Sequence, residues 1–171
     1  MSAETIFRIH LVLGYVAWLL CFGPYIWPWL KSMERPEALR AIAALHSFRF
    51  FGLVFPLPGV TGEHLPADFA AFSAFSAYGD FATGLLAIMA LLTFKVRPLF
   101  LAFVVAFNLV GVVDLLGDYI LATLADLPAR AGEFGSTYAI PIIYVPLLMI
   151  THMASFYLLM RSRPAVEPAP S

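Results

Sequence analysis

Five long apolar runs constrain the fold of this chain more than any other feature of its sequence. Charged residues, proline or glycine bound each run, and the runs cover Thr5–Leu30, Ala38–Val60, Phe69–Phe94, Pro98–Ala125 and Tyr138–Met160. Each reaches or exceeds the ~20 residues that a helix needs to cross the hydrocarbon core of a bilayer. Only 12% of the residues are charged, whereas soluble chains carry about 25%. The pattern predicts an all-α, polytopic membrane protein, a bundle of five transmembrane helices.

The second run is the weakest member of this set, because it contains two basic residues and two prolines, His46, Arg49, Pro56 and Pro58. Without it, four spans would remain and both termini would lie on one side. The distribution of lysine and arginine favours five. The first and third connections and the tail hold Lys31, Arg35, Arg40, Lys95, Arg97, Arg161 and Arg163, whereas the other side holds only Arg8 and Arg130. Because basic residues accumulate in cytoplasmic loops, the N-terminus is expected outside and the C-terminus in the cytoplasm.

The chain is expected to form one transmembrane domain over residues 1–163, followed by a disordered cytoplasmic tail over 164–171. The run Ile9–Leu30 is too long for the apolar region of a signal peptide, so it is interpreted as a retained span. A compact multipass protein of this kind fits the inner membrane of a cell. The lipid bilayer is therefore an expected partner of the chain, and so is a further copy of the chain or a larger membrane complex.

Several classes of function are excluded by composition. A net charge of −1 provides no electrostatic basis for binding nucleic acid. The single cysteine, Cys21, excludes an internal disulfide framework. The sequence contains neither an H-E-x-x-H nor a G-x-S-x-G motif, and no glycine-rich phosphate loop. No catalytic motif is recognised, so the sequence does not assign an enzyme class.

Polar and ionisable residues nevertheless occur inside the runs, where burial of charge is costly and usually functional. Counted at ~1.5 Å per residue from the basic boundary, His46 and His152 share a level about 12–13 Å deep. Asn108 and Arg49 follow near 15–17 Å, Asp80 near 20 Å and Asp114 near 24 Å. Asp118 and His10 extend this track toward the opposite interface.

Four of the runs carry one stripe of small or polar residues at three- and four-residue spacing, the spacing of one helical face. The stripes are Ser73, Ser76, Asp80, Thr83 with Gly84, and Ala87; Asn108, Gly111, Asp114 and Asp118; His46, Arg49, Gly52 and Pro56; and Pro141, Tyr144, Leu148, Thr151 with His152, and Ser155. Membrane helices bury such faces against one another. The stripes therefore predict a shared polar interior.

Arg49 cannot lose its proton at membrane depth, so it needs a carboxylate, and Asp80 or Asp114 is the expected partner. One interpretation is a purely structural ion pair that fixes the register of the helices. One arginine facing two acids, however, leaves a surplus negative charge. Proton relays and counter-ions of ligands use surplus titratable groups of this kind.

The first functional hypothesis is a site that binds or translocates a small ligand or protons, formed by Arg49, Asp80, Asn108, Asp114 and Tyr144, with Arg49 holding an anionic group. Prolines at the outer ends of the second and fifth runs would widen a vestibule above it. Tyr144, Phe55 and Trp18 are expected to line that vestibule.

Two alternatives remain open. His46 and His152, at one depth on different helices, would serve as ligands of haem b or, with Asp80, of a metal ion in a redox protein. The other alternative is a small accessory subunit of a larger membrane complex, in which the ion pair only stabilises the core.

Overall fold

The computed structural model describes residues 1–57, 59–61 and 68–161, and all regular elements in these ranges are helices. They are α1 (Ala3–Cys21), η1 (Phe22–Ile26), α2 (Trp27–Ser32), α3 (Arg35–His46), η2 (Ser47–Val54), α4 (Asp68–Leu92), α5 (Arg97–Leu124), η3 (Leu127–Tyr138), η4 (Ile140–Tyr144) and α6 (Val145–Met160). The expected disordered tail and Pro58 lie outside the described residues.

Four helices of the described ranges are long and apolar enough to span a membrane, namely Ala3–Ser32, Phe69–Leu92, Arg97–Leu124 and Ile140–Met160. Large apolar side chains cover their outward faces, among them Leu13 at 56% exposure and Val113 at 67%. These helices indicate a multipass membrane protein. The other expected span corresponds to α3 and η2, which have 12 and 8 residues and are not among the four.

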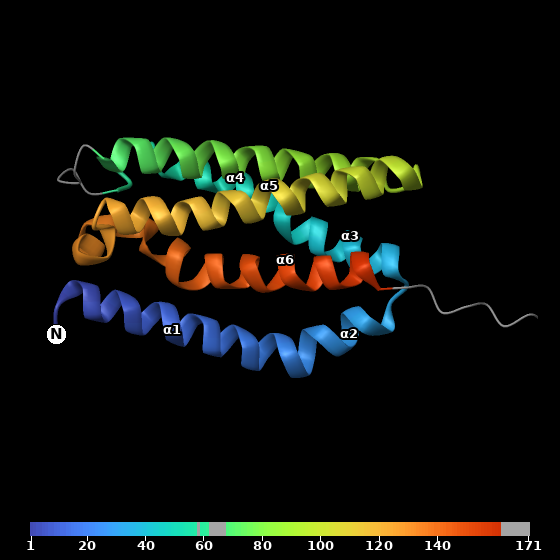
Figure 1. Ribbon diagram of the computed structural model, residues 1–171, viewed down its shortest axis with the longest axis horizontal. Coiled ribbons are helices and arrows are strands. Elements are labelled where there is room, and N and C mark those ends of the chain that lie inside the picture. The colour runs from blue at the N-terminus through green and yellow to red at the C-terminus, as the bar shows by residue number, and fades with distance from the viewer. Residues whose placement is uncertain (58, 62–67, 162–171) are drawn as a thin grey trace, which may run out of the picture.

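The helices lie side by side along the long axis, and the chain turns at two ends (Figure 1). One end, here the basic end, contains the connections α2–α3 and α4–α5 and the end of α6. Its basic residues are Lys31, Arg35, Arg40, Lys95, Arg97 and Arg161. The other end, here the η3 end, contains the N-terminus and η3 (Figure 1). All the basic clusters of the sequence that the structure describes therefore meet at one end of the bundle.

Prolines and a cap determine where several helices begin. Ser2 caps α1, because its side chain accepts a hydrogen bond from the Thr5 amide at 3.2 Å. Pro36 and Pro98 occupy first-turn positions of α3 and α5, where the missing N–H costs nothing. In the spans, the wider π-helical turns η1 and η4 contain Pro24 and Pro141. These turns accommodate proline without ending the span.

The change from α-helix to 3₁₀-helix at residue 47 alters which residues of the second run face inward. A 3₁₀-helix has three residues per turn, so positions three apart lie above one another. His46, Arg49, Gly52 and Phe55 follow this spacing and are all buried. The prediction that Pro56 shares this face is wrong: Pro56 is exposed, because four-residue spacing does not apply in η2.

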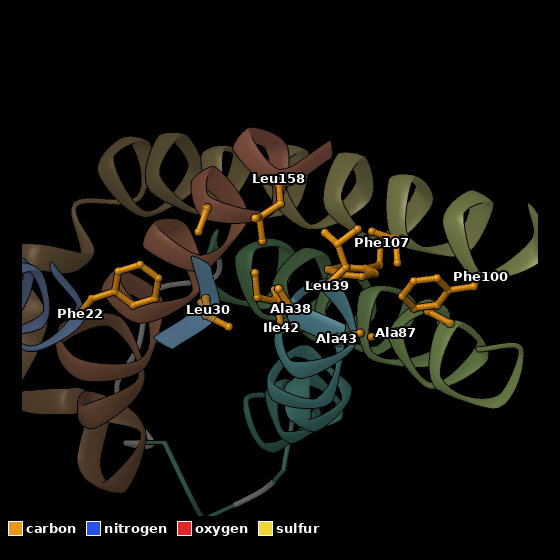
Figure 2. Close-up of a cluster of buried hydrophobic side chains, with 13 residues drawn as sticks. Phe22, Leu30, Ala38, Leu39, Ile42, Ala43, Ala87, Phe100, Phe107 and Leu158 are labelled. Carbon is orange, nitrogen blue, oxygen red and sulfur yellow. The ribbon is translucent and has the colours of Figure 1, made fainter. Parts of the chain in front are cut away.

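Two separate apolar clusters fill the interior. The basic-half core consists of Phe22, Leu30, Ala38, Leu39, Ile42, Ala43, Ala87, Ala90, Phe100, Val104, Phe107, Ala154 and Leu158. Its residues come from η1, α2, α3, α4, α5 and α6, and Figure 2 shows them in a row from Phe22 to Phe100. The η3-half core consists of Phe7, Phe55, Phe69, Phe72, Leu115, Leu127, Ala131, Phe134, Ile140, Val145 and Leu148. On α4 and α5 the buried acids and Asn108 fall between the two cores.

Candidate functional site

Arg49 lies at the centre of the polar layer and is fully buried, at 0% exposure. From η2 its Nε donates to Asp80 Oδ1 on α4 and its Nη2 donates to Asp114 Oδ2 on α5, both at 2.5 Å. The sequence offered either acid as the partner, and the structure brings both to the same guanidinium. A single cation therefore ties three segments of the bundle together.

The remaining nitrogen of the guanidinium is also engaged. Nη1 of Arg49 donates to the Gly111 carbonyl oxygen at 3.3 Å and lies 3.3 Å from Nε2 of His152. Because an arginine nitrogen only donates, Nε2 of His152 is the acceptor in this contact. Every nitrogen of Arg49 thus has a partner in the protein, and its role in holding an anionic ligand stays a prediction.

Two glycines leave the space that this cluster occupies. A Cβ atom at Gly111 would lie 2.6 Å from Arg49 Nη1, and a Cβ at Gly79 would collide with Asp114 Oδ1. The stripe on α5 included Gly111, whereas Gly79 had no place in the predicted stripes. Small residues allow membrane helices to approach closely. A glycine directly before the buried Asp80 was therefore the available signal that α4 and α5 come close together at Gly79.

A chain of hydrogen bonds continues from the ion pairs toward the basic half. Nδ1 of His152 lies 2.9 Å from Asn108 Oδ1, and Asn108 Nδ2 donates to Ser155 Oγ at 2.8 Å. Since Nε2 of His152 accepts from Arg49, its Nδ1 is the nitrogen that carries the proton and donates to Asn108. The predicted site residues Arg49, Asp80, Asn108 and Asp114 therefore belong to one connected network with His152.

His46 and His152 lie at one level, as their depths predicted, and their rings are in contact with centroids 4.1 Å apart. Nε2 of His46 lies 3.0 Å from the Thr151 hydroxyl. A haem with two axial histidines needs its porphyrin plane between the rings, and this separation leaves no space for it. In the described ranges, no group of three or more His, Cys, Asp and Glu side chains is placed to hold a metal ion. The haem and metal hypothesis stays a prediction that these contacts do not support.

A cavity of about 270 Å³ lies at the η3 end, directly beyond the ion pairs. Its walls include residues of α1, α4, α5, η3, η4 and α6, and Asp80 and Tyr144 line it together with Ser76 and Asp118. Of the three residues expected in a vestibule, Tyr144 and Phe55 line this cavity. Trp18 is not among its lining residues, and its indole nitrogen donates to the Ile143 carbonyl at 2.7 Å.

Asp118 was part of the α5 stripe but was not among the predicted site residues. Its Oδ2 accepts a hydrogen bond from the Ser76 hydroxyl at 3.1 Å, whereas its buried Oδ1 has no partner among the described residues. The hydroxyl of Tyr144 is likewise buried without a partner in the described ranges. The signal for Asp118 was its spacing of four residues from Asp114, which places both carboxylates on one helix face.

His10 lies apart from this cluster, although the polar track of the sequence extends to it. Its Nδ1 is 2.8 Å from the Tyr138 hydroxyl at the η3 end. This contact links α1 to η3 at the η3 end of the bundle.

A family model with the description Domain of unknown function (DUF8737) matches residues 6–160. The match runs from α1 to the last residue of α6. It therefore includes the ion pairs of Arg49, the histidines His46 and His152, and nearly all of the cavity wall. No curated protein and no solved structure matches the chain.

Proposed function

The chain belongs to the DUF8737 family, and we propose that it is a multipass protein of the cell (inner) membrane that binds or translocates a small ligand or protons. The site would comprise Asp80, Asp114, Asn108 and Tyr144 together with Asp118, and Arg49 would be the fixed cation that positions Asp80 and Asp114. One observation carries the proposal: the buried Arg49 is paired with Asp80 and Asp114, and Asp80 lines a cavity together with a third, partly buried carboxylate, Asp118.

The proposal includes five spans in one domain over residues 1–163. α3 and η2 follow one another without a break and together extend about 34 Å, enough to cross the ~30 Å hydrocarbon core. Arg49 of η2 contacts α4 and α5, which requires η2 to lie alongside them within the bundle. With the basic end in the cytoplasm, the N-terminus and the cavity face outside.

The charge of the site favours exchange over a purely structural role. Arg49 balances one of the carboxylates of Asp80, Asp114 and Asp118, so two negative charges remain if all three are ionised. Uncompensated charge at membrane depth is costly. Taking up protons or a cationic group removes that cost, and the cavity supplies a route to two of these carboxylates, Asp80 and Asp118.

The path from the site to the basic end is closed in the described part of the chain. The network ends at Asn108 and Ser155, and the basic-half core beyond it is apolar and tightly buried. The site therefore receives its ligand from the η3 end, and translocation requires the basic-half core to open.

Two measurements on the full chain test this function. Native mass spectrometry of protein released from mild detergent should show a bound small molecule, or proteoliposomes with a trapped pH dye should show proton uptake above that of empty vesicles. Asp118→Asn should reduce the signal, whereas Glu37→Gln should not, because Glu37 is an exposed acid at the basic end paired with Arg40. A folded wild type with neither signal would favour the accessory subunit with a structural ion-pair core.

A further inference from the structure

We infer that the ligand of the cavity is a hydrophobic amine in its protonated form, with its ammonium group at Asp118 and its apolar body toward the aromatic wall. This inference rests on the proposed function and names its class of ligand. It depends on three properties of the cavity: the charge of the wall, the unpartnered polar atoms and the shape of the apolar surface.

The charge of the wall selects cations. Its acidic residues are Glu4, Asp80, Asp118 and Asp126, and its basic residue is Arg8. Nη2 of Arg8 lies 2.5 Å from Glu4 Oε1, so these two residues balance each other. Behind the wall, Arg49 turns its nitrogens to Asp80 and Asp114. An anionic ligand would therefore meet the Asp118 carboxylate, which no cation of the described residues faces, whereas a cationic ligand is attracted to it.

The unpartnered atoms select a ligand that donates hydrogen bonds. An ionised carboxylate only accepts, and Asp118 Oδ1 has no donor among the described residues. The Tyr144 hydroxyl, which also lacks a partner in those ranges, accepts as well as donates. An ammonium group supplies the donor that Asp118 Oδ1 lacks, and the Tyr144 hydroxyl offers a further acceptor in the wall of the same cavity. Ser76 already serves the other oxygen of Asp118, which keeps the carboxylate in place.

The apolar surface excludes a bare inorganic ion as the fitting ligand. Aromatic rings of Phe7, Phe55, Phe72 and Tyr119 form much of the wall, and hard inorganic cations need several oxygen ligands instead. Ring faces attract organic ammonium groups and also bury alkyl or aryl surface. The volume, about 270 Å³, exceeds the roughly 150 Å³ of an apolar cavity that holds benzene. The cavity therefore accommodates a ring with a short alkyl chain.

Three probes of nearly equal shape test the inference: 4-phenylbutylamine, 4-phenylbutanol and 4-phenylbutyrate, which are cationic, neutral and anionic at neutral pH. Binding to the purified full chain is measured by calorimetry and by the shift in melting temperature. We expect the amine to bind about tenfold or more tightly than the alcohol or the acid, because of the three probes only the amine places a positive charge beside the Asp118 carboxylate. The variant Asp118→Asn should lose that preference, and Glu37→Gln should retain it.

A second variant covers the case in which Asp118→Asn does not fold. Ala122 lines the cavity on α5, so Ala122→Phe fills the space while leaving every charge in place. It should abolish binding of the amine.

Equal binding of all three probes, or binding of the amine that survives Ala122→Phe, would overturn the inference. If the acid or the alcohol binds best and Ala122→Phe blocks it, the ligand class is wrong while the proposed function stands. If no probe binds and the wild type shows neither a bound molecule nor proton uptake, both are wrong.

Discussion

The two halves of the bundle bury apolar side chains in different ways. The basic-half core combines alanines on α3 and α4 with Leu39, Phe100 and Phe107, and all of these side chains are at 0% exposure. In the η3-half core, phenylalanines such as Phe7 and Phe72 keep 9% and 7% exposure around a cavity. Small residues let helices approach closely, whereas large rings at the other end hold them apart. One half seals the bundle and the other leaves space, with the ion pairs at the boundary.

The largest effect is expected at that boundary. Arg49→Met leaves Asp80 and Asp114 without their cation and should lower the free energy of unfolding by about 3–5 kcal/mol, toward the upper end because two carboxylates are affected. Because a protonated carboxyl needs no cation, the loss should shrink as the pH is lowered. SDS-induced unfolding in mixed micelles over a range of pH measures it.

The matched control for Arg49→Met is the triple variant that also carries Asp80→Asn and Asp114→Asn. It removes the orphaned charges and should recover much of the lost stability. A loss in Arg49→Met that is independent of pH and not recovered in the triple variant would contradict the ion-pair account.

Truncation of one ring in each half tests the packing comparison directly. Phe107→Ala in the basic-half core should cost about 3–5 kcal/mol, because its ring is fully buried and contacts His46 with centroids 5.3 Å apart. Phe72→Ala should cost less, since its ring already borders the cavity. The same unfolding titration compares the two variants. Equal losses would show that the halves do not differ in packing.

Close approach within the cluster is tested by Gly111→Ala. The added methyl group meets Arg49 and His152, both fully buried, and should cost about 1–3 kcal/mol by overpacking. Gly23→Ala is the matched control in the first span, because a Cβ there meets nothing within 4 Å. If both glycine variants have the same stability, the cluster can accept a methyl group at Gly111, and the overpacking prediction is wrong.

The sequence predicted the long helices well, because their length and apolar character are local properties. The third and fourth runs, Phe69–Phe94 and Pro98–Ala125, match α4 and α5 to within two residues. Buried stripes followed from helical periodicity. The 3₁₀ pitch of η2 could not be predicted, because His46, Arg49 and Gly52 lie on one face of both an α-helix and a 3₁₀-helix. The next inward residue distinguishes the two helix types: it is Phe55 at three-residue spacing and Pro56 at four-residue spacing.

The sequence predicted which residues form the site but not which of them are in contact. Depth along each helix brought the two histidines to one level, yet it could not show that Asp80 and Asp114 share one guanidinium. That arrangement depends on how η2, α4 and α5 rotate against one another. The cavity and the free oxygen of Asp118 depend on side-chain packing among six segments, which no single-helix pattern contains.

The smallest effects on stability are expected from removing the hydroxyl groups of Tyr119 and Tyr144, which both line the cavity. The Tyr119 hydroxyl lies 2.8 Å from the Tyr15 hydroxyl, so Tyr119→Phe should cost about 0.5–1.5 kcal/mol. The Tyr144 hydroxyl has no partner in the described part of the chain, so Tyr144→Phe should leave stability nearly unchanged while weakening the binding of 4-phenylbutylamine. The same unfolding and calorimetric measurements compare them. A larger loss of stability in Tyr144→Phe than in Tyr119→Phe would mean that the hydroxyl serves the structure of the η3 half. It would then be unavailable to a ligand.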